Sequence, residues 1–246
     1  LSYNPIAFWQ LNDTGDPSTG TLPANDSSGN GHNGTYGPTS ETGINGITSP
    51  QPPVFPGFTT GQGALLTTAT DGSSPVAIPA LNLNTNAVTI TMWLNPSANE
   101  AVSTGLLMNR NGADTAGFGF GTTAGPTGMP PLGYTWNTNA AATYNFNSGL
   151  YPVFGAWNFA ALVVQSNSAT IYLCYIDPNT QQTNLFSAVN VIAHTPESFA
   201  GGNIWLGSDV VAGGGGPDTT RVFSGQISDA AVYNKALTSD QILALF

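Results

Sequence analysis

Short runs of strand-like residues, separated by clusters of turn-forming residues, dominate this sequence. In the clearest run, Val88–Leu94, every second residue from Val88 is apolar and would share one face of a strand, while Thr89, Thr91 and Trp93 face the other side. Similar runs, bounded by Gly, Pro, Asn and Ser, lie at Ile6–Leu11, Ala64–Thr67, Gly105–Asn109, Gly117–Gly121, Gly133–Trp136, Trp157–Val164, Ala169–Ile176, Asn203–Leu206 and Val222–Tyr233. This many short strands with turns between them predict an all-β sandwich or barrel.

One helix is expected, at the end of the chain. Thr238 can cap its first turn while the side chain of Gln241 reaches back, which forms a capping box. Asp240 lies near the positive end of the helix dipole. Ile242 and Leu245 form a narrow apolar stripe that should pack on the sandwich.

Two stretches, residues 37–63 and 212–220, are rich in Gly and Pro and are expected to be surface loops. No internal repeat or linker divides the chain, so a single domain over residues 1–246 is predicted.

Charged residues make up only 7% of the 246 residues, with 13 acidic against three basic side chains and a net charge of −10. Three cations cannot neutralise a nucleic-acid backbone, and an anionic membrane surface would repel the chain. No apolar run is long enough to span a membrane. Cys174 is the only cysteine, which excludes an intrachain disulfide. The first residues carry no signal peptide and are typical of a processed end or an excised piece.

Four motifs occur in a fixed order along the chain. They are Ala7–Leu11 in the opening strand, the Gly-rich stretch Asp26–Thr35, the central strand Val88–Pro96 and the closing stretch Phe223–Thr238. With them, the chain resembles bacterial laminin G-like domains of the concanavalin A-like lectin/glucanase superfamily. The resemblance implies a two-sheet antiparallel jelly-roll sandwich with a short C-terminal helix and adjacent terminal strands. It also implies a secreted or cell-surface protein, a location that suits a neutral polar surface.

The fold of that superfamily serves lectins and adhesion modules as well as glycosidases and lyases, so the residues must decide between binding and catalysis. A retaining glycosidase needs two carboxyl groups about 5 Å apart. The three glutamates, Glu41, Glu100 and Glu197, have no carboxylate two or three positions away. A Ser-His-Asp triad stays open, although no Gly-x-Ser-x-Gly elbow occurs. We therefore expect no enzymatic activity and no catalytic residues.

The stretch Asp26–Gly34 is the candidate metal site. A Gly-rich loop can turn carbonyl groups of Gly31 and His32 inward, while Asp26 supplies charge and Asn30 an amide oxygen, as Ca²⁺ prefers. In similar domains an acidic residue of the last long strand completes the site, and here that position is Asp229, preceded by Ser228 where the family often has an acid. The alternative is a loop that needs Gly for positive φ and Asp or Asn for local turn bonds.

The candidate glycan site lies at residues 133–148, where aromatic and amide side chains alternate. If Gly133–Trp136 and Thr143–Phe146 form paired strands, Tyr134, Trp136 and Tyr144 would form an aromatic patch beside Asn137. Sugars bind to such patches by stacking on the rings. The alternative places these rings in the core, as expected for Trp9, Trp93 and Trp157.

These features favour a non-catalytic extracellular binding module, carbohydrate-binding and stabilised by Ca²⁺. The first alternative is a structural or adhesive subunit that packs against neighbouring surface-protein domains, and the second is a polysaccharide-degrading enzyme.

Overall fold

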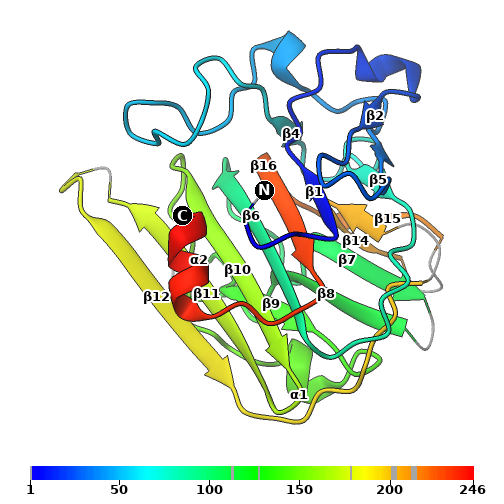
Figure 1. Ribbon diagram of the computed structural model, residues 1–246, viewed down its shortest axis with the longest axis vertical. Coiled ribbons are helices and arrows are strands. Elements are labelled where there is room, and N and C mark those ends of the chain that lie inside the picture. Colours follow the sequence, from blue (N-terminus) through cyan, green and yellow to red (C-terminus); the bar gives the residue numbers. More distant parts are fainter. Residues whose placement is uncertain (1, 112–113, 127, 178, 201–203, 212–214) are drawn as a thin grey trace.

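The computed structural model describes residues 2–111, 114–126, 128–177, 179–200, 204–211 and 215–246. Two seven-stranded antiparallel sheets pack against each other and enclose a core (Figure 1). The predicted all-β sandwich is therefore confirmed. The residues are 39% strand and 7% helix.

The first sheet has the strand order β1-β16-β6-β10-β11-β12, and β4 also pairs with β16. Its strands are β1 (Ala7–Trp9), β4 (Leu65–Thr67), β6 (Val88–Pro96), β10 (Asn158–Gln165), β11 (Ser168–Ile176), β12 (Thr183–Asn190) and β16 (Gly225–Tyr233). Ala7 lies opposite Val232, so the terminal strands are adjacent as the resemblance implies.

The second sheet has the order β2-β3-β5-β13-β7-β8-β9. Its strands are β2 (Pro23–Ala24), β3 (Gly34–Thr35), β5 (Val76–Ile78), β13 (Ile204–Leu206), β7 (Gly105–Asn111), β8 (Asp114–Phe120) and β9 (Leu132–Thr135). A separate ribbon pairs β14 (Ser208–Val210) with β15 (Pro217–Val222). The short helices are η1 (Pro17–Thr19), η2 (Gly43–Asn45), α1 (Ala141–Tyr144) and α2 (Ser239–Leu245).

The alternation predicted for the central strand decides which residues enter which core. Val88, Ile90, Met92 and Leu94 face the second sheet and are fully buried between the sheets. Trp93 points to the opposite face, where it belongs to a second apolar cluster together with Phe159 of β10 and Ile242 of α2. Thr238 caps α2 and forms the predicted capping box with Gln241. This outer cluster explains why both faces of β6 are buried.

Two local predictions are wrong, and one long strand was not predicted. Residues 143–146 do not form a strand, since a short helix, α1, ends at Tyr144. Residues 217–220 belong to strand β15 rather than to a loop, because they pair with β14. Strand β12 was not predicted, since its side chains are mostly exposed and lack a buried apolar face. The predicted residue Asn203 lies outside the described residues.

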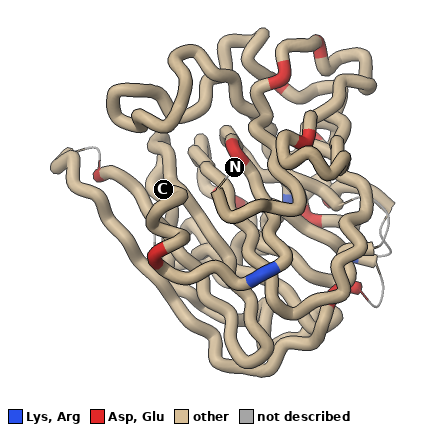
Figure 2. Tube along the Cα trace, viewed as in Figure 1, with Lys and Arg blue, Asp and Glu red and all other residues tan. Residues whose placement is uncertain are grey.

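Charged side chains are sparse along the whole trace (Figure 2). Within the described part of the chain, no helix combines the length and apolar character needed to cross a membrane.

Candidate functional site

Asp26 is the centre of a tightly hydrogen-bonded loop. One oxygen of its carboxylate accepts the backbone N–H groups of Phe8 and Ser28, and the other accepts the N–H of His32, each at 2.9 Å. The amide of Asn30 donates to the carbonyl oxygen of Ile6 at 3.0 Å. The φ of Gly31, 82°, lies in the left-handed region, which glycine adopts without strain. These bonds tie the Gly-rich loop to the first strand of the sandwich.

The same bonds bear on the predicted calcium site. The carbonyl oxygen of His32 accepts the indole N–H of Trp9 at 2.8 Å, so it is already used. Trp9 of β1 forms an isolated β-bridge with Asp26 on one side and pairs with Ala230 of β16 on the other. Strand β1 therefore lies between Asp26 and Asp229. Among the residues described, no three His, Cys, Asp or Glu side chains gather as metal ligands would. N–H donors rather than ligand oxygens surround Asp26, so this arrangement does not fit a calcium cage, and calcium binding stays a prediction.

Replacing Asp26 by Asn tests whether this carboxylate anchors the loop or binds calcium. The amide can offer one oxygen but would turn an NH₂ group toward an N–H, so the loop loses at least one hydrogen bond. We expect the free energy of unfolding to fall by about 1–3 kcal/mol. Urea unfolding should show the same loss in excess EDTA and in millimolar calcium.

The matched control is Glu41→Gln, which removes the same charge at an exposed residue whose side chain makes no hydrogen bond within the described part of the chain. If Asp26→Asn weakened the protein only in calcium, the carboxylate would be a metal ligand and its role as an anchor of the loop would be refuted.

The predicted glycan residues do not form one exposed patch. Trp136 has no exposed surface, because its ring packs against Phe199 in the core and its indole N–H donates to the carbonyl oxygen of Thr195 at 2.8 Å. Trp136 is therefore a core ring, which is the alternative stated above for these aromatic residues, and it is not part of an exposed glycan-binding patch. The side-chain amide of Asn137 donates to the carbonyl oxygen of Ala193 and accepts the backbone N–H of Thr195, so Asn137 holds residues 193–195 in place.

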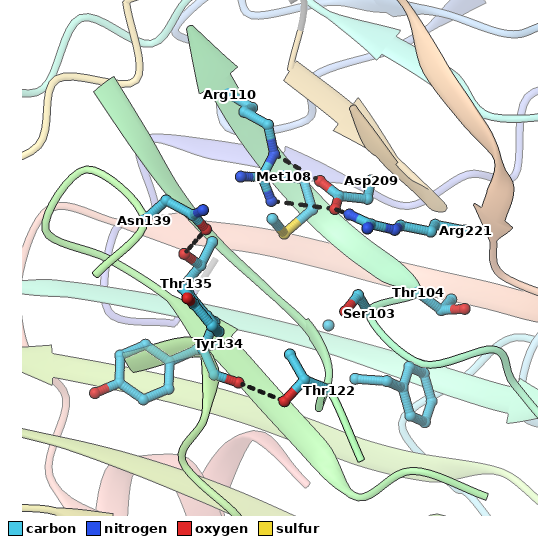
Figure 3. Close-up of a pocket in the computed structure, with 13 residues that line it drawn as sticks. Ser103, Thr104, Met108, Arg110, Thr122, Tyr134, Thr135, Asn139, Asp209 and Arg221 are labelled. Atoms are coloured by element: carbon cyan, nitrogen blue, oxygen red, sulfur yellow. Dashed lines mark hydrogen bonds and ion pairs between the residues drawn. The ribbon is translucent and has the colours of Figure 1, made fainter. Parts of the chain in front are cut away.

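The two tyrosines of the predicted site lie near a cavity that the sequence did not indicate. Tyr134 is 4% exposed, and its hydroxyl contacts the ring of His194 at 2.9 Å and the amide of Asn190. Burial raises the pKa of Tyr134 to about 12. Tyr144, at the end of α1, is half-buried. Both residues line the cavity, which has a volume of about 250 Å³ (Figure 3).

Strand alternation places this cavity on the outer face of the second sheet. Leu107 and Phe118 point into the core, so their neighbours Met108 and Gly119 face outward. On this face β8 carries Gly119, which the backbone of Thr104 approaches closely. A Cβ atom at Gly119 would overlap the carbonyl oxygen of Thr104, so no larger residue fits.

Two arginines and one aspartate converge on one wall of the cavity (Figure 3). Nε and Nη2 of Arg110 donate to the two carboxylate oxygens of Asp209 at 3.2 and 3.1 Å, and Nη1 of Arg221 donates to the same carboxylate at 2.9 Å. The Asp209 side chain is 1% exposed, whereas those of Arg110 and Arg221 are 16% and 39% exposed. The buried carboxylate therefore orients two accessible guanidinium groups.

Hydroxyl and amide groups line the rest of the cavity. The hydroxyl of Thr135 donates to the side-chain oxygen of Asn139 at 2.9 Å, and the hydroxyl of Thr122 donates to Asn145 at 3.1 Å. Ser103 and Thr104 lie on the opposite side (Figure 3). A cavity with this lining is suited to a small, hydroxyl-rich ligand.

The carboxyl groups with raised pKa values lie outside this cavity. Burial raises the pKa of Glu100 to about 8, of Glu197 to about 7 and of Asp229 to about 6. Glu100 accepts the N–H of Ser224, and Glu197 accepts the N–H of Thr138. Among the residues that line the cavity, Asp209 is the single carboxylate. The geometry thus offers no pair of carboxyl groups to a bound sugar.

A second cavity, of about 570 Å³, lies on the outer face of the first sheet, beside α2. Its walls are largely aromatic, but the rings contact one another, since Phe55, Phe58 and Phe246 all pack on Trp93 with centroids 5.0–5.5 Å apart. Asp229, the predicted metal ligand, lines this cavity and accepts the hydroxyl of Ser228 at 2.7 Å.

Sequence reasoning missed the three charged residues of the first cavity. Arg110, Asp209 and Arg221 come from β7, β14 and β15 and are 99 and 12 residues apart along the chain. The sequence offered one weak signal for this cluster. Arg110 and Arg221, two of the three basic residues of the chain, each lie directly beside a predicted strand.

Comparison with solved structures shows the fold at low sequence identity. Domain 4 of AbnA, an extracellular GH43 arabinanase from Geobacillus stearothermophilus solved with arabinotriose, is 16% identical with a TM-score of 0.56, over 98% of both chains. A Trypanosoma rangeli sialidase solved with sialic acid is 12% identical with a TM-score of 0.57. The match includes 100% of this chain and 33% of the sialidase chain. A GH54 α-L-arabinofuranosidase mutant is 13% identical with a TM-score of 0.51, over 89% of this chain and 48% of that one.

A search of curated protein sequences finds no match. The profile of a protein family described as the concanavalin A-like lectin/glucanases superfamily matches residues 70–243. That match covers the central strand β6, both arginines of the cavity and the closing strand β16. The chain belongs to the concanavalin A-like lectin/glucanase superfamily.

Proposed function

We propose that this chain is a non-catalytic, extracellular carbohydrate-binding module whose binding site is the cavity on the outer face of the second sheet. The observation that carries the proposal is the lining of that cavity. Arg110 and Arg221, oriented by Asp209, stand beside the hydroxyl and amide groups of Ser103, Thr122 and Asn139. Convergent polar groups in a preformed hollow are what a sugar ring needs for orientation and specificity.

The size of the cavity supports a small ligand. Its volume of about 250 Å³ lies just below the range of drug-sized sites, so one sugar residue, such as a chain end or a side branch, suits it better than a long segment. The arabinotriose complex of the AbnA domain, which has the same fold, supports the choice of carbohydrate as ligand class.

The carboxylate arrangement supports binding rather than hydrolysis. Among the described residues that line the cavity, the one carboxylate is Asp209, which is buried and already accepts both arginines, so it is poorly placed to act as nucleophile or acid. Release of reducing ends from a panel of polysaccharides would instead favour the enzyme alternative.

A glycan array followed by calorimetry tests the proposal with Asn139→Gly. This change removes an exposed amide at the cavity, and glycine tolerates the left-handed φ of 65° found there. Loss of one hydrogen bond should weaken binding of the best glycan about threefold to tenfold.

The matched control is Asn82→Gly, another exposed asparagine with a left-handed φ of 53°, which does not line either cavity described above. Its affinity should equal that of the unchanged protein. The proposal fails if no glycan binds, or if both variants bind as the unchanged protein does.

One observation favours the structural or adhesive alternative. The strand β12 is an edge of the first sheet, carries no charge and exposes the apolar side chains of Leu185, Phe186 and Val189 by 42–51%. Such an edge can pair with another chain. Reversible self-association in sedimentation velocity, without glycan binding, would favour this alternative.

A further inference from the structure

The cations of this chain are concentrated at the proposed glycan site. The sequence has three basic residues against 13 acidic ones, and two of the three, Arg110 and Arg221, line the same cavity. The third, Lys235, is exposed and follows β16. Two of the three basic side chains of this acidic protein are therefore presented to one cavity.

The charged acceptor among the residues that line the cavity, Asp209, is already used. Asp209 receives four hydrogen bonds, three from the two arginines and one from the N–H of Val210 at 2.7 Å. The side-chain oxygen of Asn139 receives the hydroxyl of Thr135. Asp218, which does not line the cavity, lies 3.6 Å from Nε of Arg221 and takes part of that charge.

Several donors remain without a partner among the described residues. They are Nη1 of Arg110, Nη2 of Arg221 and the amide nitrogen of Asn139. Two of these nitrogens belong to guanidinium groups, whose planar N–H groups match a carboxylate bidentately. The site thus has a surplus of donors.

A donor surplus discriminates between sugars by a simple count. Each hydroxyl of a neutral sugar accepts hydrogen bonds but also brings a proton that needs an acceptor, whereas an ionised carboxylate only accepts. Because both arginines already use the Asp209 carboxylate, a carboxylate of the ligand satisfies the free N–H groups and brings no proton that needs a further acceptor.

We propose that the cavity takes the carboxylate-bearing residue of an acidic glycan, a hexuronate, with the carboxylate held by Arg110 and Arg221. This inference rests on the proposed function and names the class of sugar that the same site would bind. The arginines bind the carboxylate, and the hydroxyl groups of the cavity contact the ring of the sugar.

Calorimetry with matched pairs of sugars tests the inference. Galacturonate and glucuronate oligosaccharides are compared with galactose and glucose oligosaccharides of the same linkage and length. We expect the acidic member of one pair to bind at least tenfold more tightly.

Arg221→Gln should weaken binding of the acidic sugar about tenfold and weaken binding of the neutral sugar by a smaller factor, while the pair between Arg110 and Asp209 stays in place. Lys235→Gln removes the same charge outside the cavity and should have no effect. Raising the salt concentration should reduce the preference for the acid, since the contact is ionic.

The outcomes separate this inference from the proposed function. If neutral sugars bind as tightly as uronates, or if Arg221→Gln and Lys235→Gln weaken uronate binding equally, the inference is overturned while carbohydrate binding stands. If no sugar of either kind binds, both are overturned.

Discussion

Deletion of residues 222–246 should abolish folding of this protein. The deletion removes β16, which lies between β1 and β6 in the first sheet and also pairs with β4. It would leave β1 and β4 without a partner strand and β6 paired on one side only, and it would remove the fully buried side chains of Ile227 and Val232 from the core. The loss exceeds what a domain with about 5–15 kcal/mol of total stability can absorb.

A shorter deletion provides the control. Removing residues 234–246 keeps β16 but strips α2 from the outer cluster around Trp93. This shorter chain should melt cooperatively at a lower temperature, whereas the longer deletion should show no thermal transition and no dispersed amide signals. A soluble 1–221 chain with a cooperative transition would contradict the strand order on which the expectation rests.

Trp136→Ala should destabilise the protein by about 3–5 kcal/mol, as removal of a fully buried Trp does. The ring fills the core between Phe199 and His194. Its centroid lies 5.7 Å from the ring centroid of Phe199 and 6.4 Å from that of His194. Its removal also leaves the carbonyl oxygen of Thr195 without the indole donor. Urea unfolding followed by circular dichroism measures the loss.

Trp136→Phe is the matched variant, since it keeps an aromatic ring in the core but removes the indole N–H. It should lie between the unchanged protein and Trp136→Ala. A nearly unchanged stability of Trp136→Ala, combined with lost glycan binding, would instead return Trp136 to the binding site.

Much of the fold could be predicted because its signals are local. The alternation over Val88–Leu94 places apolar residues on one face, and Thr238 and Gln241 form a capping box within one turn. Neighbouring side chains decide both features, so sequence spacing alone is enough to find them. The exposed strand β12 lacks such a pattern, because little of it is buried.

The Gly-rich loop shows where a local signal becomes ambiguous. Gly, Asn and Asp at residues 26–34 are equally typical of a cation site and of a loop held by its own hydrogen bonds. In this structure three N–H groups donate to Asp26, as in a loop held by its own hydrogen bonds, and one of them comes from Phe8, 18 residues away. No spacing rule could indicate that contact.

The sequence by itself determined the class of fold, the central and terminal strands and the capped helix, since period-two alternation and capping act between residues that are near in the chain. The tertiary structure alone decided that Trp136 is core and that Arg110, Asp209 and Arg221 share one wall of a cavity. The physical reason is that pairing of β7 with β13, and close packing of β14 on β7, bring together residues 99 positions apart. Such long-range contacts depend on the register of whole strands, which no single segment encodes.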